Sequence, residues 1–343
     1  MPDTYTSQFS GEEIDSALRA AQIISGASTP AELRKKLEIR GDTIPVSAED
    51  STLISDAVKY RTNPNLLDNW YFGRPVNQRG QTSYGQTQQY SIDRWMITND
   101  YAYVDVADGY ITLRGNDVNG FGGIMEKLES SIKNALLGKT ATLSFFAKLY
   151  TTCAIAGQPF TPTGDTDNFE LYSVTFSGSS ADYVLFNAVT AVATGAKIAD
   201  ILAAKLELGS TQTLAHKENG VWVLNEIPDF GEQLRRCRRY RWRFCPAEYV
   251  GSAIAFGISV NAARALIYLP EQMRTNPTLN FNKNTGLFLT GVDGDIFGMT
   301  LAFTWTSPNS ICVEFQKSGA FAPNSVYFVR GDGSSAIDIS ADL

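Results

Sequence analysis

The side chains that could perform catalysis are few in this sequence. His216 is the only histidine, and it lies in the polar stretch 214–220 (LAHKENG), which is typical of a hairpin turn. A Ser-His-Asp triad would have to use this residue, and no Gly-x-Ser-x-Gly motif accompanies it. Glycoside hydrolysis needs two carboxylates at a set separation, but no local motif selects a pair among the 36 acidic residues. The sequence therefore predicts a protein that is not an enzyme.

Aromatic side chains offer a different chemistry, the binding of sugars. The apolar face of a sugar ring stacks on an exposed Trp or Tyr ring, while amides and carboxylates bind the hydroxyl groups. Trp70 and Trp95 follow strand-like runs, and we expect them in the core. Five tyrosines in polar sequence contexts are the candidate glycan-binding residues: Tyr84, Tyr101, Tyr103, Tyr150 and Tyr183.

Positive charge is concentrated in a run of arginines at residues 235–243 (RRCRRYRWR). Aromatic residues alternate with basic ones in many proteins that bind single-stranded nucleic acid. The same pattern also suits arginines that pair with carboxylates and stack on rings. The whole chain has a net charge of −7 and a pI near 4.9, whereas phosphate binding needs clustered positive charge. We therefore interpret the run as structural and expect no nucleic-acid partner.

The sequence contains only incomplete patterns of metal-binding residues. Oxygen-rich turns occur at Asp165 and Asp167 and at 291–295 (GVDGD), but the first lacks the Glu at position twelve of an EF-hand loop. The tripeptide RGD at 330–332 is interpreted as a plain turn. Four cysteines without C-x-x-C spacing indicate free thiols or small buried side chains, not a zinc site or a disulfide framework: Cys153, Cys237, Cys245 and Cys312.

Five short motifs follow one another along the chain. They are N-L-L-D-N at 65–69, Q-R-G at 78–80, Y-x-x-D-R-W at 90–95, A-K-L-E-x-G-S at 204–210 and L-x-x-C-R-R-Y at 234–240. Their order resembles the jelly-roll, carbohydrate-binding-module-like domain of phage tail fibre and receptor-binding proteins. The family has C-Q-R-Y-Y where this chain has Arg238 and, after its single tyrosine, Arg241. This departure concerns local contacts more than the fold.

The resemblance implies a function and a set of partners. It implies a virion tail protein that binds host surface polysaccharide without catalysis, forms a homotrimer, and attaches to phage tail or baseplate proteins through its N-terminus. Carbohydrate modules of this kind often hold a structural calcium, and no other cofactor is expected. Two alternatives stay open: a structural baseplate or fibre component without a ligand, and a glycan depolymerase.

The first residues, MPDTYTSQFSGEEID, contain neither the basic nor the apolar segment of a signal peptide. No apolar run approaches the length that spans a membrane. We therefore expect synthesis in the bacterial cytoplasm and no membrane insertion, and the resemblance implies location in the virion tail.

Short apolar runs separated by Gly, Asn and Asp turns predict a mostly β chain. Three parts are expected: an N-terminal helical attachment and trimerisation region at 1–64, a carbohydrate-binding-like jelly-roll β-sandwich at 65–245, and a second, smaller C-terminal β-sandwich at 246–343. No repeat of fixed period is present, which argues against a solenoid.

The N-terminal part carries the clearest helical pattern. Ser10 and Glu13 form a capping box, and an apolar stripe follows at spacings of three and four residues from Ile14 to Ile24. Such a short helix must bury its stripe to be stable. Either it docks on its own β domain, or it forms a parallel bundle around a symmetry axis. The resemblance favours the bundle.

Overall fold

The computed structural model describes residues 63–342, apart from short gaps at 86, 100, 108, 117–119, 166, 179–181, 247–249 and 284–285. The stretch from Arg61 to Leu343 is one unit and is described by itself. The helices predicted before residue 61, and the trimer contacts expected of them, lie outside the described residues.

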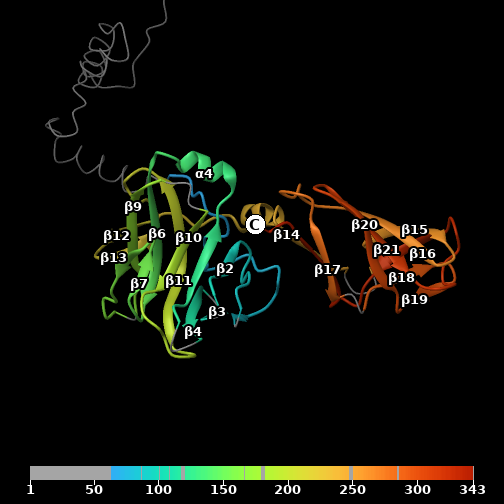
Figure 1. Ribbon diagram of the computed structural model, residues 1–343, viewed down its shortest axis with the longest axis horizontal. Coiled ribbons are helices and arrows are strands. Elements are labelled where there is room, and N and C mark those ends of the chain that lie inside the picture. Colours follow the sequence, from blue (N-terminus) through green and yellow to red (C-terminus); the bar gives the residue numbers. More distant parts are fainter. Residues whose placement is uncertain are drawn as a thin grey trace, which may run out of the picture. The chain divides into compact units, whose positions relative to one another are not determined.

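The first half of this unit is a sandwich of two antiparallel sheets (Figure 1). One sheet has six strands in the order β1 (Ser83–Gly85), β3 (Ala102–Ala107), β4 (Tyr110–Gly115), β11 (Lys197–Leu208), β6 (Thr140–Leu149) and β9 (Glu170–Ser177). The other has five strands in the order β2 (Trp95–Ile97), β5 (Gly123–Lys127), β10 (Tyr183–Ala188), β7 (Cys153–Ile155) and β8 (Gln158–Phe160). The chain crosses repeatedly between the sheets, as in a jelly roll.

Aromatic rings fill the space between the two sheets. The Trp95 ring lies 5.1 Å from that of Phe72 and 6.2 Å from that of Phe145, both edge-on. Phe145 in turn lies 5.0 Å from Phe186 on the opposite sheet. Edge-to-face pairs at these distances add stability beyond the area they bury. Trp70 and Trp95 are both buried, as predicted.

Two short helices and a hairpin complete this half. They are α4 (Ser130–Leu136) and α5 (Phe230–Arg238). The side chain of Asp229 caps α5 by accepting from the N–H of Glu232 at 2.8 Å. The hairpin consists of β12 (Ala215–Glu218) and β13 (Val221–Leu224), joined at Asn219 and Gly220, both with positive φ.

The second half is also a sandwich of two sheets. A three-stranded sheet has the order β14 (Arg241–Phe244), β23 (Ala336–Ser340), β17 (Thr278–Lys283). A seven-stranded sheet has the order β19 (Gly294–Ile296), β18 (Phe288–Gly291), β22 (Val326–Arg330), β15 (Ala253–Ser259), β16 (Ala262–Tyr268), β21 (Ser310–Gln316), β20 (Thr300–Ser307). Their common core includes Phe244, Phe315 and Ile337. The predicted mostly β chain with two sandwiches is confirmed.

The second sandwich includes a strand that lies before residue 246, where the C-terminal part was expected to begin. β14 follows α5 directly and pairs along its whole length with β23, so residues 241–244 belong to the second sandwich. The backbone N–H of Ala341 donates to the carbonyl of Tyr240 at 2.6 Å. The end of the chain therefore lies beside the junction between α5 and β14.

A pair of leucines tests the assignment of the first core. Leu113 on β4 is fully buried, whereas Leu137 after α4 is mostly exposed. We expect Leu113→Ala to lower the free energy of unfolding by about 2–5 kcal/mol, because it leaves a cavity in the core. The matched Leu137→Ala should change it by less than about 0.5 kcal/mol. Urea unfolding followed by tryptophan fluorescence measures both, and equal losses would contradict this core.

Candidate functional site

The motif residues of the first half form a buried charge network, not an exposed site. Arg94, which is completely buried, lies between two carboxylates: its Nε is 3.2 Å from Asp68 Oδ2 and its Nη2 is 3.2 Å from Glu126 Oε1. Arg236 of α5 binds the other oxygen of Asp68 at 2.6 Å. The Arg94 guanidinium also stacks 3.7 Å above the ring of Tyr240. Three motifs that are far apart in sequence therefore meet here.

A second group of motif residues fixes the loop between Trp70 and β1. Asn69, with φ of 50°, donates from Nδ2 to the carbonyls of Val76 at 2.9 Å and Asp93 at 2.7 Å. Arg79 binds Asp93 at 3.0 Å and Asp342 at 2.8 Å. The Q-R-G motif thus connects the loop to Asp342, just after the last strand β23 (Ala336–Ser340).

The A-K-L-E motif of β11 is likewise structural. Lys205 Nζ lies 2.7 Å from Glu226 Oε1. Glu207 accepts from both the backbone N–H and the hydroxyl of Thr213, at 2.7 and 2.5 Å. Asn65 bonds the β11 backbone at Ala204 and Leu206. All these groups hold segments against the sheet, so they leave no reactive group for a ligand.

Burial changes the protonation of two carboxyls in this network. Desolvation raises the pKa of Glu126 to about 8, although Arg94 opposes the shift. Desolvation also raises the pKa of Asp93 to about 6, against the effect of Arg79. Both carboxyls bind a proton more tightly in the folded than in the unfolded chain. Their contribution to stability therefore declines as the pH rises from about 4 to about 8.

The outer surface of the six-stranded sheet carries a different set of polar side chains, which we call the polar face. Along β3 and β4 the inward residues are apolar and buried, and the outward residues are polar. Strand register brings nine residues onto this surface: Ser83, Tyr103, Asp105, Thr112, Arg114, Lys148, Tyr150, Lys197 and Asp200.

Two carboxylates organise the polar face. Asp200 accepts from the hydroxyls of Thr112 and Tyr150 at 2.6 and 2.7 Å and from Lys197 Nζ at 2.9 Å. Burial opposes ionisation of Asp200, but these hydrogen bonds outweigh it and lower its pKa. Asp105 accepts from Ser83 Oγ and from Arg114 Nε, both at 2.6 Å. The cations and rings around them are therefore held in fixed positions.

Two of the five predicted tyrosines lie on the polar face. The Tyr103 ring covers Gly85, where any Cβ would lie 2.0 Å from the ring. The Tyr150 ring lies 5.0 Å from Lys197 Nζ. Tyr103 and Tyr150 are three strands apart, or about 14 Å at the usual strand spacing. The side chains of Arg114 and Lys197 remain about a third exposed, so the face is open to a ligand.

The other three predicted tyrosines lie elsewhere. Tyr84 is buried, and its hydroxyl accepts from the N–H of Gln81 and bonds Asn77. Tyr101 is partly exposed beside Gly120, in a different loop. Tyr183 is on β10 of the opposite sheet. The structure therefore brings together Tyr103 and Tyr150 and separates the rest.

Sequence reasoning missed the charged members of the polar face. Asp105 and Arg114 stand in strand sequences that alternate with buried residues, and this alternation was the signal that could have revealed them. Asp200 on β11 gives no such signal. The β11 bulges between Lys197 and Ala199 and between Ile201 and Ala203 break that alternation. Such a bulge moves the following side chains to the other face.

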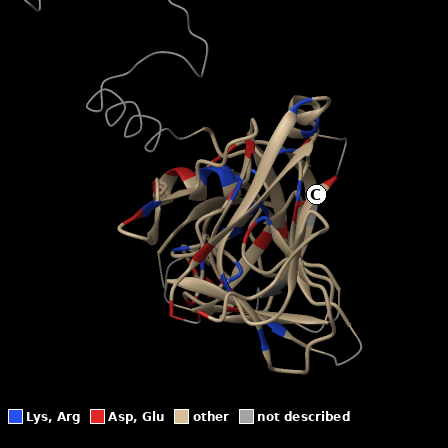
Figure 2. Cartoon of the chain, turned by 90° about the vertical axis from the view of Figure 1, so that its left-hand side faces the viewer, with Lys and Arg blue, Asp and Glu red and all other residues tan. Residues whose placement is uncertain are grey.

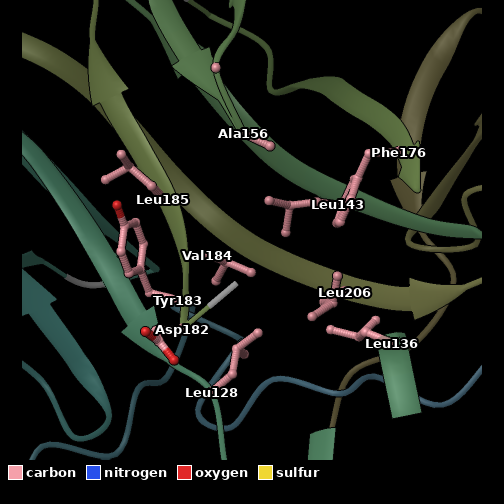
Figure 3. Close-up of a pocket in the computed structure, with 11 residues that line it drawn as sticks. Leu128, Leu136, Leu143, Ala156, Phe176, Asp182, Tyr183, Val184, Leu185 and Leu206 are labelled. Atoms are coloured by element: carbon pink, nitrogen blue, oxygen red, sulfur yellow. The ribbon is translucent and has the colours of Figure 1, made fainter. Parts of the chain in front are cut away.

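An apolar cleft lies where α4 meets the ends of β6, β9, β10 and β11 (Figure 3). It has a volume of about 440 Å³ and is lined by Leu128, Leu136, Leu143, Ala156, Gly157, Phe176, Asp182, Tyr183, Val184, Leu185 and Leu206. Asp182 is the sole carboxylate among these residues, and it binds Lys133 at 2.8 Å. The cleft therefore lacks the carboxylate pair of a glycosidase.

The sequence suggested that His216 is a turn residue, but the structure places it in a strand. It lies on β12, one strand of the hairpin, and its side chain is largely buried. Its Nε2 is 2.9 Å from Glu218 Oε1, and its Nδ1 bonds Asn225. The hairpin was predicted correctly, but the turn itself falls at Asn219 and Gly220.

The remaining sequence features have structural roles in the described residues. The arginine run pairs with carboxylates, as interpreted: Arg235 with Glu232, Arg236 with Asp68, Arg239 with Glu129 and Arg241 with Asp338. RGD does not itself form the turn that the sequence suggested: Arg330 ends β22, and Asp332 begins the bend that follows, where it accepts from the backbone N–H groups of Ser334 and Ser335. All four cysteines are free thiols.

Charges of both signs are mixed over the side of the molecule seen in Figure 2. Within the described part of the chain, no three His, Cys, Asp or Glu side chains gather closely enough to hold a metal ion. No ligand set can therefore be named for the calcium that the resemblance implies. Neither described helix has the length and apolar character needed to cross a membrane.

Comparisons with known proteins add little to this geometry. No family model matches the chain, and no curated protein matches it. Among solved structures, the chain is similar to the N-terminal CBM22-1–CBM22-2 tandem domain of Xyn10C from Paenibacillus barcinonensis, at 10% identity and a TM-score of 0.26. The match covers 82% of this chain and 97% of that one. A TM-score this low carries no argument about function.

The buried carboxyl of Glu126 makes stability depend on pH. We expect wild-type protein to lose stability relative to Glu126→Gln as the pH rises from about 5 to about 8, because Gln has no proton to release. Unfolding by urea at pH 5, 6, 7 and 8 measures the difference between the two chains. The exposed Glu232→Gln is the control and should show no such trend; a parallel course for wild type and Glu126→Gln would contradict the buried network.

Proposed function

We propose that this chain is a tail-fibre or receptor-binding protein of a phage, or of a phage-derived particle, that adheres to host surface glycans without cutting them. The observation that carries the proposal is the polar face, where Tyr103 and Tyr150 lie beside hydrogen-bonded carboxylates and partly exposed cations. The virion assignment rests on the resemblance that the five motifs carry.

The chemistry of the polar face suits a carbohydrate. A sugar offers apolar C–H faces and a periphery of hydroxyl groups, so it needs rings for stacking and fixed polar groups for hydrogen bonding. Arg114 and Lys197 can donate to hydroxyl oxygens, and the Asp105 carboxylate can accept from hydroxyl hydrogens. Their hydrogen bonds hold them in place before a ligand arrives, which lowers the ordering entropy of binding.

Adhesion would gain its strength from several copies of this face. An open, flat face with two rings binds each glycan weakly. In a homotrimer attached to the tail through the N-terminus, several weak sites act on one cell surface, and effective concentration multiplies their strength. Reversible binding of this kind requires no bond to be made or broken.

The two alternatives make different demands on the chain. A glycan depolymerase needs two carboxylates across a substrate. On the polar face Asp200 is buried and saturated by three donors, and the apolar cleft holds a single carboxylate. A structural component without a ligand would not need rings and cations held on an open face. Glycan adhesion is therefore the better supported function.

Binding should depend on the tyrosines of the polar face. We expect Tyr103→Ala and Tyr150→Ala each to weaken binding of purified host polysaccharide by roughly 3- to 10-fold, since one aromatic contact contributes about 0.5–1.5 kcal/mol. Biolayer interferometry with immobilised polysaccharide measures the change. Tyr101→Ala and Tyr183→Ala are matched controls off the face and should bind like wild type, with thermal unfolding confirming that all four variants fold. Losses confined to these two controls would place the site elsewhere.

Adsorption to cells distinguishes adhesion from both alternatives. We expect the full chain to sediment with candidate host cells and to lose this binding after their surface polysaccharide is removed. Chromatography of polysaccharide incubated with the protein should show unchanged chain length. Shortened chains would establish a depolymerase, and failure to bind any host cell would leave a structural component.

A further inference from the structure

The outer surface of the seven-stranded sheet is unusually apolar. On β15 the residues that point inward (Ala253, Ala255 and Gly257) are small, whereas those that point outward (Ile254, Phe256 and Ile258) are large. A Cβ at Gly257 would lie 2.2 Å from the carbonyl oxygen of Ala322. The usual arrangement of a half-buried strand, with large apolar side chains inside and polar ones outside, is therefore reversed on β15. On β16, Leu266 and Tyr268 point outward, and Ile267 points into the core.

The large outward side chains form one continuous patch. Strand register aligns Phe328, Ile254 and Leu266 in one row, and Trp305 extends the row through Cys312. We call these residues the apolar sheet patch: Ile254, Phe256, Ile258, Leu266, Tyr268, Trp305, Val326 and Phe328, each between 41% and 74% exposed.

The area of the patch exceeds what a monomer normally exposes. Eight such side chains, each about half exposed, present on the order of 800 Å² of apolar surface. The largest apolar patch of a typical monomer is about 300–600 Å². A standard protein interface buries about 800 Å² on each partner. The patch therefore has the size of one side of a stable interface.

We propose that the apolar sheet patch is an interface between copies of this chain, separate from any contact made by residues 1–60. The charged side chains that border it on β16 and β21 pair with each other: Arg264 Nε lies 2.7 Å from Glu314 Oε2. The patch has no net charge of its own and does not repel an identical surface. Closed symmetric assemblies are the commonest state of soluble oligomers.

The shape of the patch argues against a single helix of the same chain as its cover. The patch residues lie on β22, β15, β16 and β20, and β21 with its buried Cys312 lies between β16 and β20, so the patch spans the width of five strands. At the usual strand spacing this is about 20 Å, whereas a helix with its side chains is about 10 Å wide. A second flat sheet matches the width.

Photo-crosslinking tests which occupant covers the patch. Tyr268 is replaced in the full chain by the photoreactive amino acid p-benzoylphenylalanine, and the illuminated protein is run on a denaturing gel. We expect a band at the mass of two chains, with the crosslinked peptide mapping to residues 253–329 of a second copy. The same replacement at Val292, which is exposed at a hairpin tip off the patch, should give no such band.

Each other result overturns the proposal. Crosslinks only to residues 1–60, in the same or another chain, would show that the N-terminal part covers the patch. The absence of any two-chain band would show that the patch is free. Phe256→Glu gives a second measurement: light scattering should show a lower mass than for wild type, or, where the N-terminal part still holds the copies together, loss of the Tyr268 crosslink. An unchanged crosslink yield in Phe256→Glu would also overturn it.

Discussion

The buried guanidinium of Arg94 is the interaction on which most of the first sandwich depends. A charge taken out of water is costly unless it is paired and fully hydrogen-bonded. Arg94 therefore requires Asp68, Glu126 and the Tyr240 ring to be in place together. These partners come from the loop before β1, from β5 and from the end of α5. The fold of each segment is thus conditional on the others, and breaking a buried pair of this kind typically destabilises a protein by about 3–5 kcal/mol.

The network also explains why the motifs are informative about fold and not directly about ligands. Asp68, Asp93 and Arg94 are polar residues in loop-like sequence, where exposed binding residues would be sought. They are in fact among the most buried side chains of the chain. A hydrophobic core accepts many combinations of apolar residues. A buried ionic network accepts few combinations of charged residues, so its residue types are easier to recognise in a sequence. Tyr103 and Tyr150, the residues that we propose to bind glycan, stand outside the motifs.

Local sequence patterns predicted the β class, the sandwiches and the buried tryptophans, because alternation and turn residues act over a few positions. They could not predict the polar face, since its members come from strands whose neighbours are remote in sequence. Asp105 meets Thr112 across a hairpin, but Asp200 reaches Thr112 only through the pairing of β4 with β11. Likewise, the sequence of β15 does not show which of its residues point inward. Both sets of alternate residues are apolar, and only packing in the folded chain decides which set is buried.

The ion pair between Arg79 and Asp342 joins residues that are 263 positions apart. During synthesis, at about 5–20 residues per second, the loop around Arg79 therefore waits roughly 13–50 s before its last partner leaves the ribosome. β14 waits less long, roughly 5–20 s, because its partner strand β23 follows it by fewer than 100 residues. Until then Arg79 has only Asp93 as a carboxylate partner among the described residues. The first sandwich can form its aromatic core early, but the ion pair between Arg79 and Asp342 forms as one of the last events of folding.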